Sequence, residues 1–508
     1  MLDFSQILYV FEPLNLLLMT VGVFGGLIVG AMPGLTSTMA VALLVPITFG
    51  MTVEMGLVLL MAVYIGAISG GLVSAALLNI PGTPSSVATT FDAFPMAKRG
   101  EAGKALAYGV FASFLGSLLS FFALALLAPI LGAFALRFGP FEYFALVVFT
   151  LTCIISISGK SQVKGLLSAC VGLLMAMVGL SNTDGVTRFT FGLSALQSGF
   201  AEMPVLIGMY AISQVLMDIA DIKKPFKIIS ASFTVREFLQ TAARFRHSVK
   251  NVIRSSLIGI GIGILPGVGP GLSNIVAYST AKSSDKDPDS FGQGNPDGII
   301  ASETANNAAT GGAMIPLLTL GIPGDVTTMM MLGAFMIHGV QPGPLLMRDH
   351  GNLVLIILSA YFISNILMLL LQVYFIRVLI KSLLIPRFIL YPVILGLCVI
   401  GCYALNSSMT DVWIFLGTGL LGYVFTRLGF PLLPLVLGLL LGRMAETQLR
   451  VSIVMGNGSL AGYLERPIAL AFLAAAALSV GFSLYSKRKA RLRREGLAAA
   501  LASENAQG

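Results

Sequence analysis

Charged residues are scarce in this 508-residue chain: they make up only 11% of it, whereas 56% of the residues are hydrophobic. The mean hydropathy is +0.90. Soluble domains carry roughly 25% charged residues, and a soluble core could not hide this much apolar surface. The composition therefore excludes a soluble globular protein and predicts a polytopic membrane protein.

Histidine and cysteine are also rare, with three and four residues. His247, His338 and His350 show no metal-ligand spacing, and the cysteines all lie in apolar stretches. Cys398 and Cys402 are one helical turn apart, but two thiols alone make a poor metal site, so packing is the favoured interpretation. We expect no resident cofactor and no metal, apart from sodium as a candidate coupling ion.

Patterns typical of enzymes are missing as well. The chain has no Gly-rich loop that ends in Lys-Ser/Thr, so we do not expect it to hydrolyse ATP. The run Gly267–Gly271 follows an apolar helix rather than a strand, which makes it a weak dinucleotide-binding match. Because no nucleophile–base pair or haem ligand set stands out, we predict that the chain is not an enzyme.

The basic residues, which give a net charge of +8, are concentrated in short loops and the tail. Such placement marks cytoplasmic loops and needs no nucleic-acid partner. It predicts a first membrane repeat at 1–219 with its amino terminus outside and a basic cytoplasmic linker at 220–251. A second repeat at 252–486 and a cytoplasmic tail at 487–508 would follow. The amino terminus lacks a basic n-region, so we expect the first apolar stretch to stay as a spanning helix.

Apolar stretches of helical length recur along the chain and predict an all-α fold with about twelve spanning or re-entrant helices. The longer ones lie near 14–31, 57–79, 105–130, 141–158, 165–180, 202–219, 252–265, 299–320, 352–376, 388–405, 411–426 and 467–486. Half-length pieces lie near 35–50, 85–96, 271–281, 326–338 and 431–442.

Four Pro-Gly pairs interrupt these stretches, two in each half of the chain: Pro33-Gly34, Pro81-Gly82, Pro266-Gly267 and Pro323-Gly324. Proline removes an amide donor and glycine loosens the backbone, so each pair can break a membrane helix. Broken helices in corresponding places of two halves indicate the binding site of a secondary transporter.

The two halves also match in their small residues. A shift of 242 positions (323 − 81) maps Pro81 onto Pro323 and Gly70 onto Gly312, and a shift of 233 (266 − 33) maps Pro33 onto Pro266. Because the predicted loop sides are opposite in the two copies, the halves form an inverted-topology repeat. Unrelated duplicated turns would explain the Pro-Gly pairs but not the matched small residues.

Small hydroxylated or amide residues lie at or next to the breaks. The candidates for substrate binding are Thr36, Ser37, Asn79, Thr83, Ser85, Ser86, Thr327 and Thr328, and the same pattern includes Thr38, Thr89, Thr90, Ser273 and Asn274. Such residues cap a half-helix and leave amides that suit carboxylate or phosphate oxygens. Plain capping without a ligand is the alternative.

The most polar run at membrane depth is Ala301–Gly312. Glu303, Asn306 and Asn307 lie three and four positions apart and therefore share a helical face. A carboxylate at such depth is costly unless it is paired or coordinated, so we predict a role for Glu303 and Asn307 in binding a hard cation, with Asn306 and Asn307 also near the substrate. The alternative is a loop end near Asp297.

Asp325 is ambiguous. It is the natural N-cap of a half-helix at 326–338, yet a charge there would repel an anion. If Asp325 lines the site, it favours a co-bound cation, a proton carrier or a substrate with a positive group.

Several long motifs resemble the large integral-membrane subunit of bacterial tripartite tricarboxylate transporters. They are Gly30–Leu35, Tyr64–Gly66, Leu78–Pro84, Phe94–Ala97, Gly100–Leu106, Gly263–Gly267, Ser302–Ala308 and Leu320–Gly324. In that family the position of Asp325 more often holds a small hydroxylated residue, which puts citrate in doubt as the substrate.

The resemblance implies a permease of the bacterial inner membrane that imports di- or tricarboxylates with a sodium or proton gradient. The partners it implies are a small integral-membrane subunit and a periplasmic solute-binding protein; a homodimer stays open. A passive organic-anion channel with the same broken helices is the main alternative. An ion-pumping subunit of a membrane enzyme is less favoured, because it would need a chain of buried ionisable residues.

Overall fold

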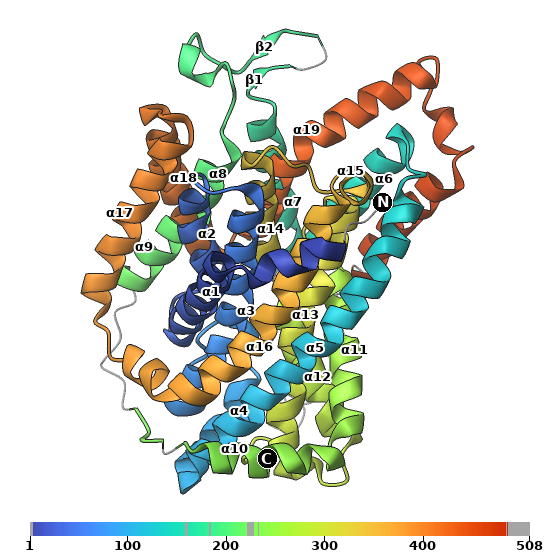
Figure 1. Ribbon diagram of the computed structural model, residues 1–508. Helices are drawn as coiled ribbons and strands as arrows, with labels where there is room; N and C mark the ends of the chain where they lie inside the picture. Colours follow the sequence, from blue (N-terminus) through green and yellow to red (C-terminus); the bar gives the residue numbers. More distant parts are fainter. Residues whose placement is uncertain are drawn as a thin grey trace, which may run out of the picture. The chain divides into compact units, whose positions relative to one another are not determined.

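Helices dominate this protein (Figure 1), whose computed structural model describes residues 4–157, 161–181, 184–220, 228–231, 233–483 and 485. The chain forms two compact units, each built from two separate stretches of sequence. Unit 1 comprises residues 1–137 and 201–424, and unit 2 comprises residues 138–200 and 425–508.

Unit 1 holds the Pro-Gly breaks and most of the helices. In chain order these are η1 (Phe4–Phe11), α1 (Pro13–Ala31), α2 (Ser37–Thr48), α3 (Val53–Leu78), η2 (Pro84–Ser86), α4 (Thr89–Met96), η3 (Ala97–Glu101), α5 (Ala102–Ala135), α8 (Glu202–Ile207), η5 (Gly208–Ile212), α9 (Ser213–Ala220), α10 (Val235–Arg244), η6 (Phe245–His247), α11 (Val249–Ile264), α12 (Gly269–Ser284), η7 (Pro288–Ser290), α13 (Pro296–Leu320), α14 (Val326–Ile337), α15 (Pro344–Asp349), α16 (Gly351–Ser382), α17 (Arg387–Asn406) and α18 (Met409–Arg427).

Unit 2 contains α6 (Pro140–Ile157), α7 (Gln162–Ala176), η4 (Ser194–Leu196), α19 (Leu432–Met455), η8 (Leu460–Tyr463) and an apolar helix over Pro467–Ser483. A short antiparallel hairpin, β1 (Gly179–Leu180) with β2 (Thr187–Arg188), lies between α7 and η4. Arg188 ties this hairpin to α19 through two hydrogen bonds to Glu446, at 2.8 and 3.0 Å.

Among the described residues, eight helices are long and apolar enough to cross a membrane. They confirm the predicted all-α polytopic class. The predicted half-length piece at 431–442 was wrong, since α19 continues to Met455 without a break. Helix α13 is long but not among the eight, because the polar run Ala301–Gly312 lies inside it.

Helix pairs α1–α3 and α11–α13 are packed by the same contacts. A Cβ on Gly30 would lie 2.1 Å from the carbonyl oxygen of Ala67, and one on Gly263 would lie 2.5 Å from that of Ala309. These pairs correspond under the shifts of 233 (263 − 30) and 242 (309 − 67) found in the sequence. Only glycine permits such a close approach of two helix backbones.

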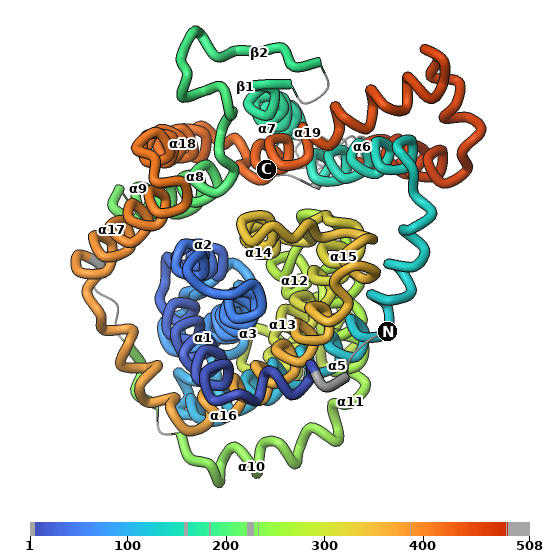
Figure 2. Tube along the Cα trace, turned by 45° about the horizontal axis from the view of Figure 1, so that its top comes forward, coloured from blue at the N-terminus to red at the C-terminus, as the bar shows by residue number. Residues whose placement is uncertain are grey.

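The two copies run in opposite directions. Tyr64, Ser69 and Thr89 follow one another along α3 and α4, and they bond respectively to Asp325, Asn307 and Glu303, whose numbers decrease. The segments 64–89 and 303–325 therefore meet in antiparallel order, which is the order that the predicted inverted-topology repeat implies. In Figure 2, α1, α2 and α3 lie together beside the group α12, α13 and α14.

The division into sequence halves and the membrane side of each loop stay predictions. Residues 221–227 and 232 of the basic linker, and the tail 487–508, lie outside the described residues.

Candidate substrate and coupling site

Each Pro-Gly stretch lies between two helices of unit 1, so a helix ends and another begins inside the fold. Gly34 and Gly267 have φ values of +96° and +75°, which reverse the chain between α1 and α2 and between α11 and α12. Asn79, with φ +57°, and Gly321, with φ +71°, end α3 and α13 in the left-handed conformation. The segments after these ends meet the two reversed hairpins at two places, which we name the first and second crossings.

The first crossing joins residues 83–89 to the α11–α12 hairpin and to α13. The Ala88 amide donates to Oδ1 of Asn274 at 2.6 Å, and Nδ2 of Asn306 donates to the Ser85 carbonyl at 3.0 Å. Thr83 Oγ1 lies 2.6 Å from Ser85 Oγ and 3.2 Å from Ser86 Oγ. All these side chains are buried, so the first crossing is a cluster of hydroxyl and amide groups.

The second crossing joins residues 36–38 to the start of α14 and to α3. Ser37 Oγ lies 2.9 Å from Thr327 Oγ1. Asp325 is the N-cap of α14: its Oδ1 accepts from the Thr328 amide at 2.7 Å, while its Oδ2 accepts from the Tyr64 hydroxyl at 2.7 Å. Asp325 is 5% exposed, so this crossing contains a buried carboxylate.

Glu303 lies in the middle of α13 and is fully buried. Its Oε1 accepts from Thr89 at 2.6 Å. Its Oε2 accepts from Ser113 at 3.0 Å and from Asn306 and Asn307 at 3.4 Å each. The carboxylate thus connects α4, α5 and α13. The alternative of a loop end at this run was wrong, because the whole run is buried helix.

Asn307 extends this network to α3. Its Oδ1 accepts from Ser69 at 2.7 Å, and its Nδ2 also donates to Asn306 Oδ1 at 2.5 Å. Gln372 of α16 donates to the Ser69 carbonyl at 3.1 Å. The network around Glu303 therefore links five helices of the unit: α3, α4, α5, α13 and α16.

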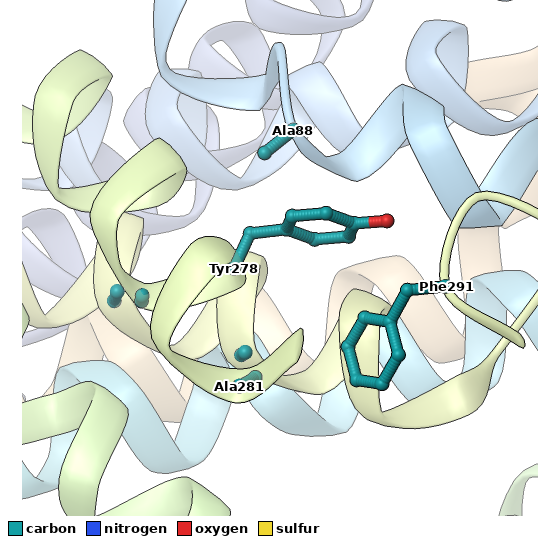
Figure 3. Packing of buried hydrophobic residues seen from close by; sticks show 7 residues of the cluster. Ala88, Tyr278, Ala281 and Phe291 are labelled. Atoms are coloured by element: carbon teal, nitrogen blue, oxygen red, sulfur yellow. The ribbon is translucent and has the colours of Figure 1, made fainter. Parts of the chain in front are cut away.

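A second buried carboxylate, Asp92, fastens α4 to the loop before α13. Its Oδ1 accepts from three backbone amides, those of Gly292, Gly294 and Asn295, at 2.9, 2.7 and 2.8 Å. Its Oδ2 accepts from Tyr278 at 2.8 Å. The Tyr278 ring packs between Ala88 and Phe291 (Figure 3), which shields this clamp from water.

The structure brings some of the predicted site residues together and places others apart from them. Ser37 and Thr327 meet, and so do Asn306 and Ser85. Thr36 instead caps α2 by accepting from the Met39 amide at 3.1 Å. Asn79 is exposed at the end of α3.

Four residues that complete the network were not predicted: Tyr64, Ser69, Asp92 and Ser113. Thr89 and Asn274 were expected among the polar residues that follow Pro-Gly breaks. Ser113 has no such signal, since only the packing of α5 on α13 brings it to Glu303.

Negative charge dominates the buried parts of the two crossings. Glu303 and Asp325 are buried there, whereas no lysine, arginine or histidine is buried anywhere in the described part of the chain. A bound anion would thus be held by hydroxyl groups, amides and cations rather than by a basic side chain. Oxygen-rich groups beside broken helices suit sodium; over the same residues, no group of three His, Cys, Asp or Glu side chains could hold a metal ion.

Comparison with known proteins adds a family match that covers both crossings. The model of the tripartite tricarboxylate transporter TctA family matches residues 16–437. An uncharacterized 52.8 kDa protein from the TAR-I ttuC' 3' region of Agrobacterium vitis is 36% identical over 465 residues, which are 91% of each chain. An uncharacterized protein from the TAR-II ttuC' 3' region of the same organism is 36% identical over 212 residues, or 42% of this chain and 88% of that one. No solved structure matches.

Proposed function

This chain belongs to the tripartite tricarboxylate transporter TctA family, and from that premise we propose that it imports di- or tricarboxylates or related organic anions by secondary active transport. As a TctA protein it is the permease subunit of a tripartite system, which implies a small membrane subunit and a binding protein as partners. We propose that the binding protein is periplasmic and that the permease lies in the bacterial inner membrane.

One observation carries the coupling proposal: both crossings are buried and hydroxyl-rich, yet they contain carboxylates and no basic side chain. An anionic substrate bound at the first crossing would lie beside the buried Glu303 carboxylate, so like charges would meet at low dielectric, where repulsion is strong. Co-binding of sodium ions or protons removes that repulsion. We therefore propose that cation binding and substrate binding depend on each other.

The substrate would reach the hydroxyl groups of Thr83, Ser85 and Ser86 at the first crossing. Asn306 and Asn307 would present amide groups beside them, and Glu303 would hold these amides in place or contribute to the cation site. At the second crossing, Ser37, Thr327 and Thr328 would supply the remaining polar contacts.

The basic loops support our proposal for the orientation in the membrane. Arg99, in the basic loop after α4, donates to the Gly294 carbonyl at 3.0 Å. The loop between α12 and α13 therefore lies on the same side as that basic loop, which the positive-inside rule assigns to the cytoplasm. We propose that this loop faces the cytoplasm and does not dock the periplasmic binding protein.

Radiolabelled uptake into proteoliposomes would test this function. The permease is reconstituted with its small subunit, the binding protein is added outside, and a panel of carboxylates is tested with and without a sodium or proton gradient. We expect accumulation that needs the gradient and the binding protein. Equilibration without accumulation would instead identify a channel, because a channel cannot concentrate its solute.

A further inference from the structure

The two crossings are related by the internal repeat but differ in charge. The shift of 242 positions maps Thr83 onto Asp325 (325 − 83), Ser85 onto Thr327 and Ser86 onto Thr328. The hydroxyl groups are therefore kept in both copies. At the capping position, the first crossing has a neutral threonine and the second crossing has a carboxylate.

Asp325 occupies the place that a ligand carboxylate would take at the amino end of α14. Its Oδ1 already accepts from the Thr328 amide and hydroxyl, both at 2.7 Å. In the first crossing, Thr83 makes no corresponding cap hydrogen bond to the backbone. The amino end of α14 is thus already neutralised by the chain itself.

Tyr64 holds the Asp325 carboxylate in this position. Its hydroxyl donates to Oδ2 at 2.7 Å, and Tyr64 is fully buried. The hairpin residue Gly269 lies beside Asp325, since a Cβ added to Gly269 would lie 2.8 Å from the Asp325 Cβ. The Tyr64 hydroxyl and the Thr328 amide and hydroxyl therefore fix the carboxylate from two helices.

Resting on the proposed function, we infer that Asp325, positioned by Tyr64, narrows its substrate class: among the organic anions proposed, the permease prefers those with one carboxylate to di- and tricarboxylates. The substrate presents its carboxylate to Thr83, Ser85 and Ser86 at the first crossing. It presents a neutral, hydrogen-bond-donating group, such as a hydroxyl, to the second crossing. A second carboxylate there would face Asp325 without a free helix end to stabilise it.

Binding to the purified permease and small subunit tests this selection without the binding protein, which has its own preference. The ligands are 4-hydroxybutyrate and succinate, which have equal chain lengths, and citrate; binding is measured by thermal stabilisation in a fixed sodium concentration. We expect 4-hydroxybutyrate to bind at least about 10-fold more tightly than succinate, since like charges in a buried site repel strongly.

The variant Asp325→Asn keeps the size and the cap of α14 but removes the charge. We expect it to shift the ratio of the two affinities toward succinate by at least about 10-fold. Asp325→Ser gives the same readout if the asparagine variant does not fold. The matched control is Asp349→Asn, at an exposed carboxylate outside the membrane helices, which should leave the ratio unchanged.

An unchanged affinity ratio in both folded Asp325 variants would overturn the inference. So would a variant that alters only the sodium dependence, because Asp325 would then belong to the coupling site. If the wild-type complex neither binds nor accumulates any carboxylate, the proposed function itself fails. If it binds carboxylates but its preference does not depend on residue 325, only the present inference fails.

Discussion

Helices α3 and α13 occupy repeat-related places, yet they carry different chemistry. In both, a backbone carbonyl of the helix lies close to a glycine of the partner helix: that of Ala67 to Gly30 of α1, and that of Ala309 to Gly263 of α11. Glu303 and Asn307 of α13, in contrast, correspond to Met61 and Ile65 of α3 under the shift of 242 (303 − 61). The backbone geometry is thus kept in both copies, whereas the buried polar network has developed in one.

The largest effect should come from breaking the shared geometry. Gly30→Val and Gly263→Val each place side-chain atoms where a carbonyl oxygen lies, so the two helix pairs would separate and we expect almost no folded protein. Monodisperse yield in detergent measures this. The matched controls are Gly25→Val and Gly261→Val, because a Cβ at those glycines meets open space. Equal loss in the controls would mean that helix propensity, rather than the close approach, is responsible.

Glu303→Ala should disrupt the buried polar network that distinguishes α13 from α3. Ser113 would lose its acceptor, and Thr89, Asn306 and Asn307 would each lose one of theirs. A buried group left unsatisfied costs about 1–3 kcal/mol. We expect uptake to disappear and the thermal midpoint to fall, with Glu303→Gln in between. Met61→Leu at the matching position keeps the volume and should cost less than about 1.5 kcal/mol. Full uptake in Glu303→Ala would exclude the carboxylate from the mechanism.

A smaller effect is expected at Asp92, whose repeat-related residue is Ala334 (334 − 92 = 242). Asp92→Ala leaves three amides and the Tyr278 hydroxyl without their acceptor, so we expect about 1–3 kcal/mol of destabilisation or more. Tyr278→Phe removes one bond and should cost about 0.5–1.5 kcal/mol. Thermal unfolding should give this order; a reversed order would show that ring packing, rather than the clamp, holds the loop.

The smallest effect should be found in the exposed link before α16. The Arg348 guanidinium holds the pKa of the Asp349 carboxyl below its ordinary value by hydrogen bonding and charge. A lowered pKa stabilises the fold above the unfolded-state pKa, and this contribution is lost as the pH falls through the folded-state value. Because both groups are exposed, Arg348→Gln should leave uptake and the thermal midpoint at pH 7 nearly unchanged. A marked loss of uptake would assign this link a role in partner docking.

The ends of the long helices were largely predictable from the sequence. The apolar stretches predicted both ends of α1 and α3 to within about four residues, and the start of α16 to within one, because hydrophobic length is a local property. Helix α16 continues to Ser382, beyond its predicted end near residue 376. The break positions followed from Pro-Gly pairs for the same reason. Helix α19 was expected to be short because its polar second half, beyond Gly442, resembles a loop in composition, and only its packing on α6 and α7 extends the helix.

The candidate site was predicted in part. Ser37, Thr327, Asn306 and Ser85 were expected near the substrate, but their pairings cross more than 200 positions of sequence. Ser113 lies in apolar surroundings that gave no signal, and Tyr64 belonged to a family motif but had no predicted role. Their roles depend on which side of each helix lies against Glu303 or Asp325. Only the packing of the helices decides that.

The sequence alone determined that this chain spans a membrane, that its helices break at four Pro-Gly pairs, and that it repeats itself. These properties depend on residue composition and spacing, which act locally along the chain. The tertiary structure decided that Glu303 is held by three helices, that Asp92 clamps a loop, and that Asp325 is covered by Tyr64. Buried polar groups need partners wherever those can be found, and here the partners come from the opposite copy of the repeat or from a helix distant in the sequence.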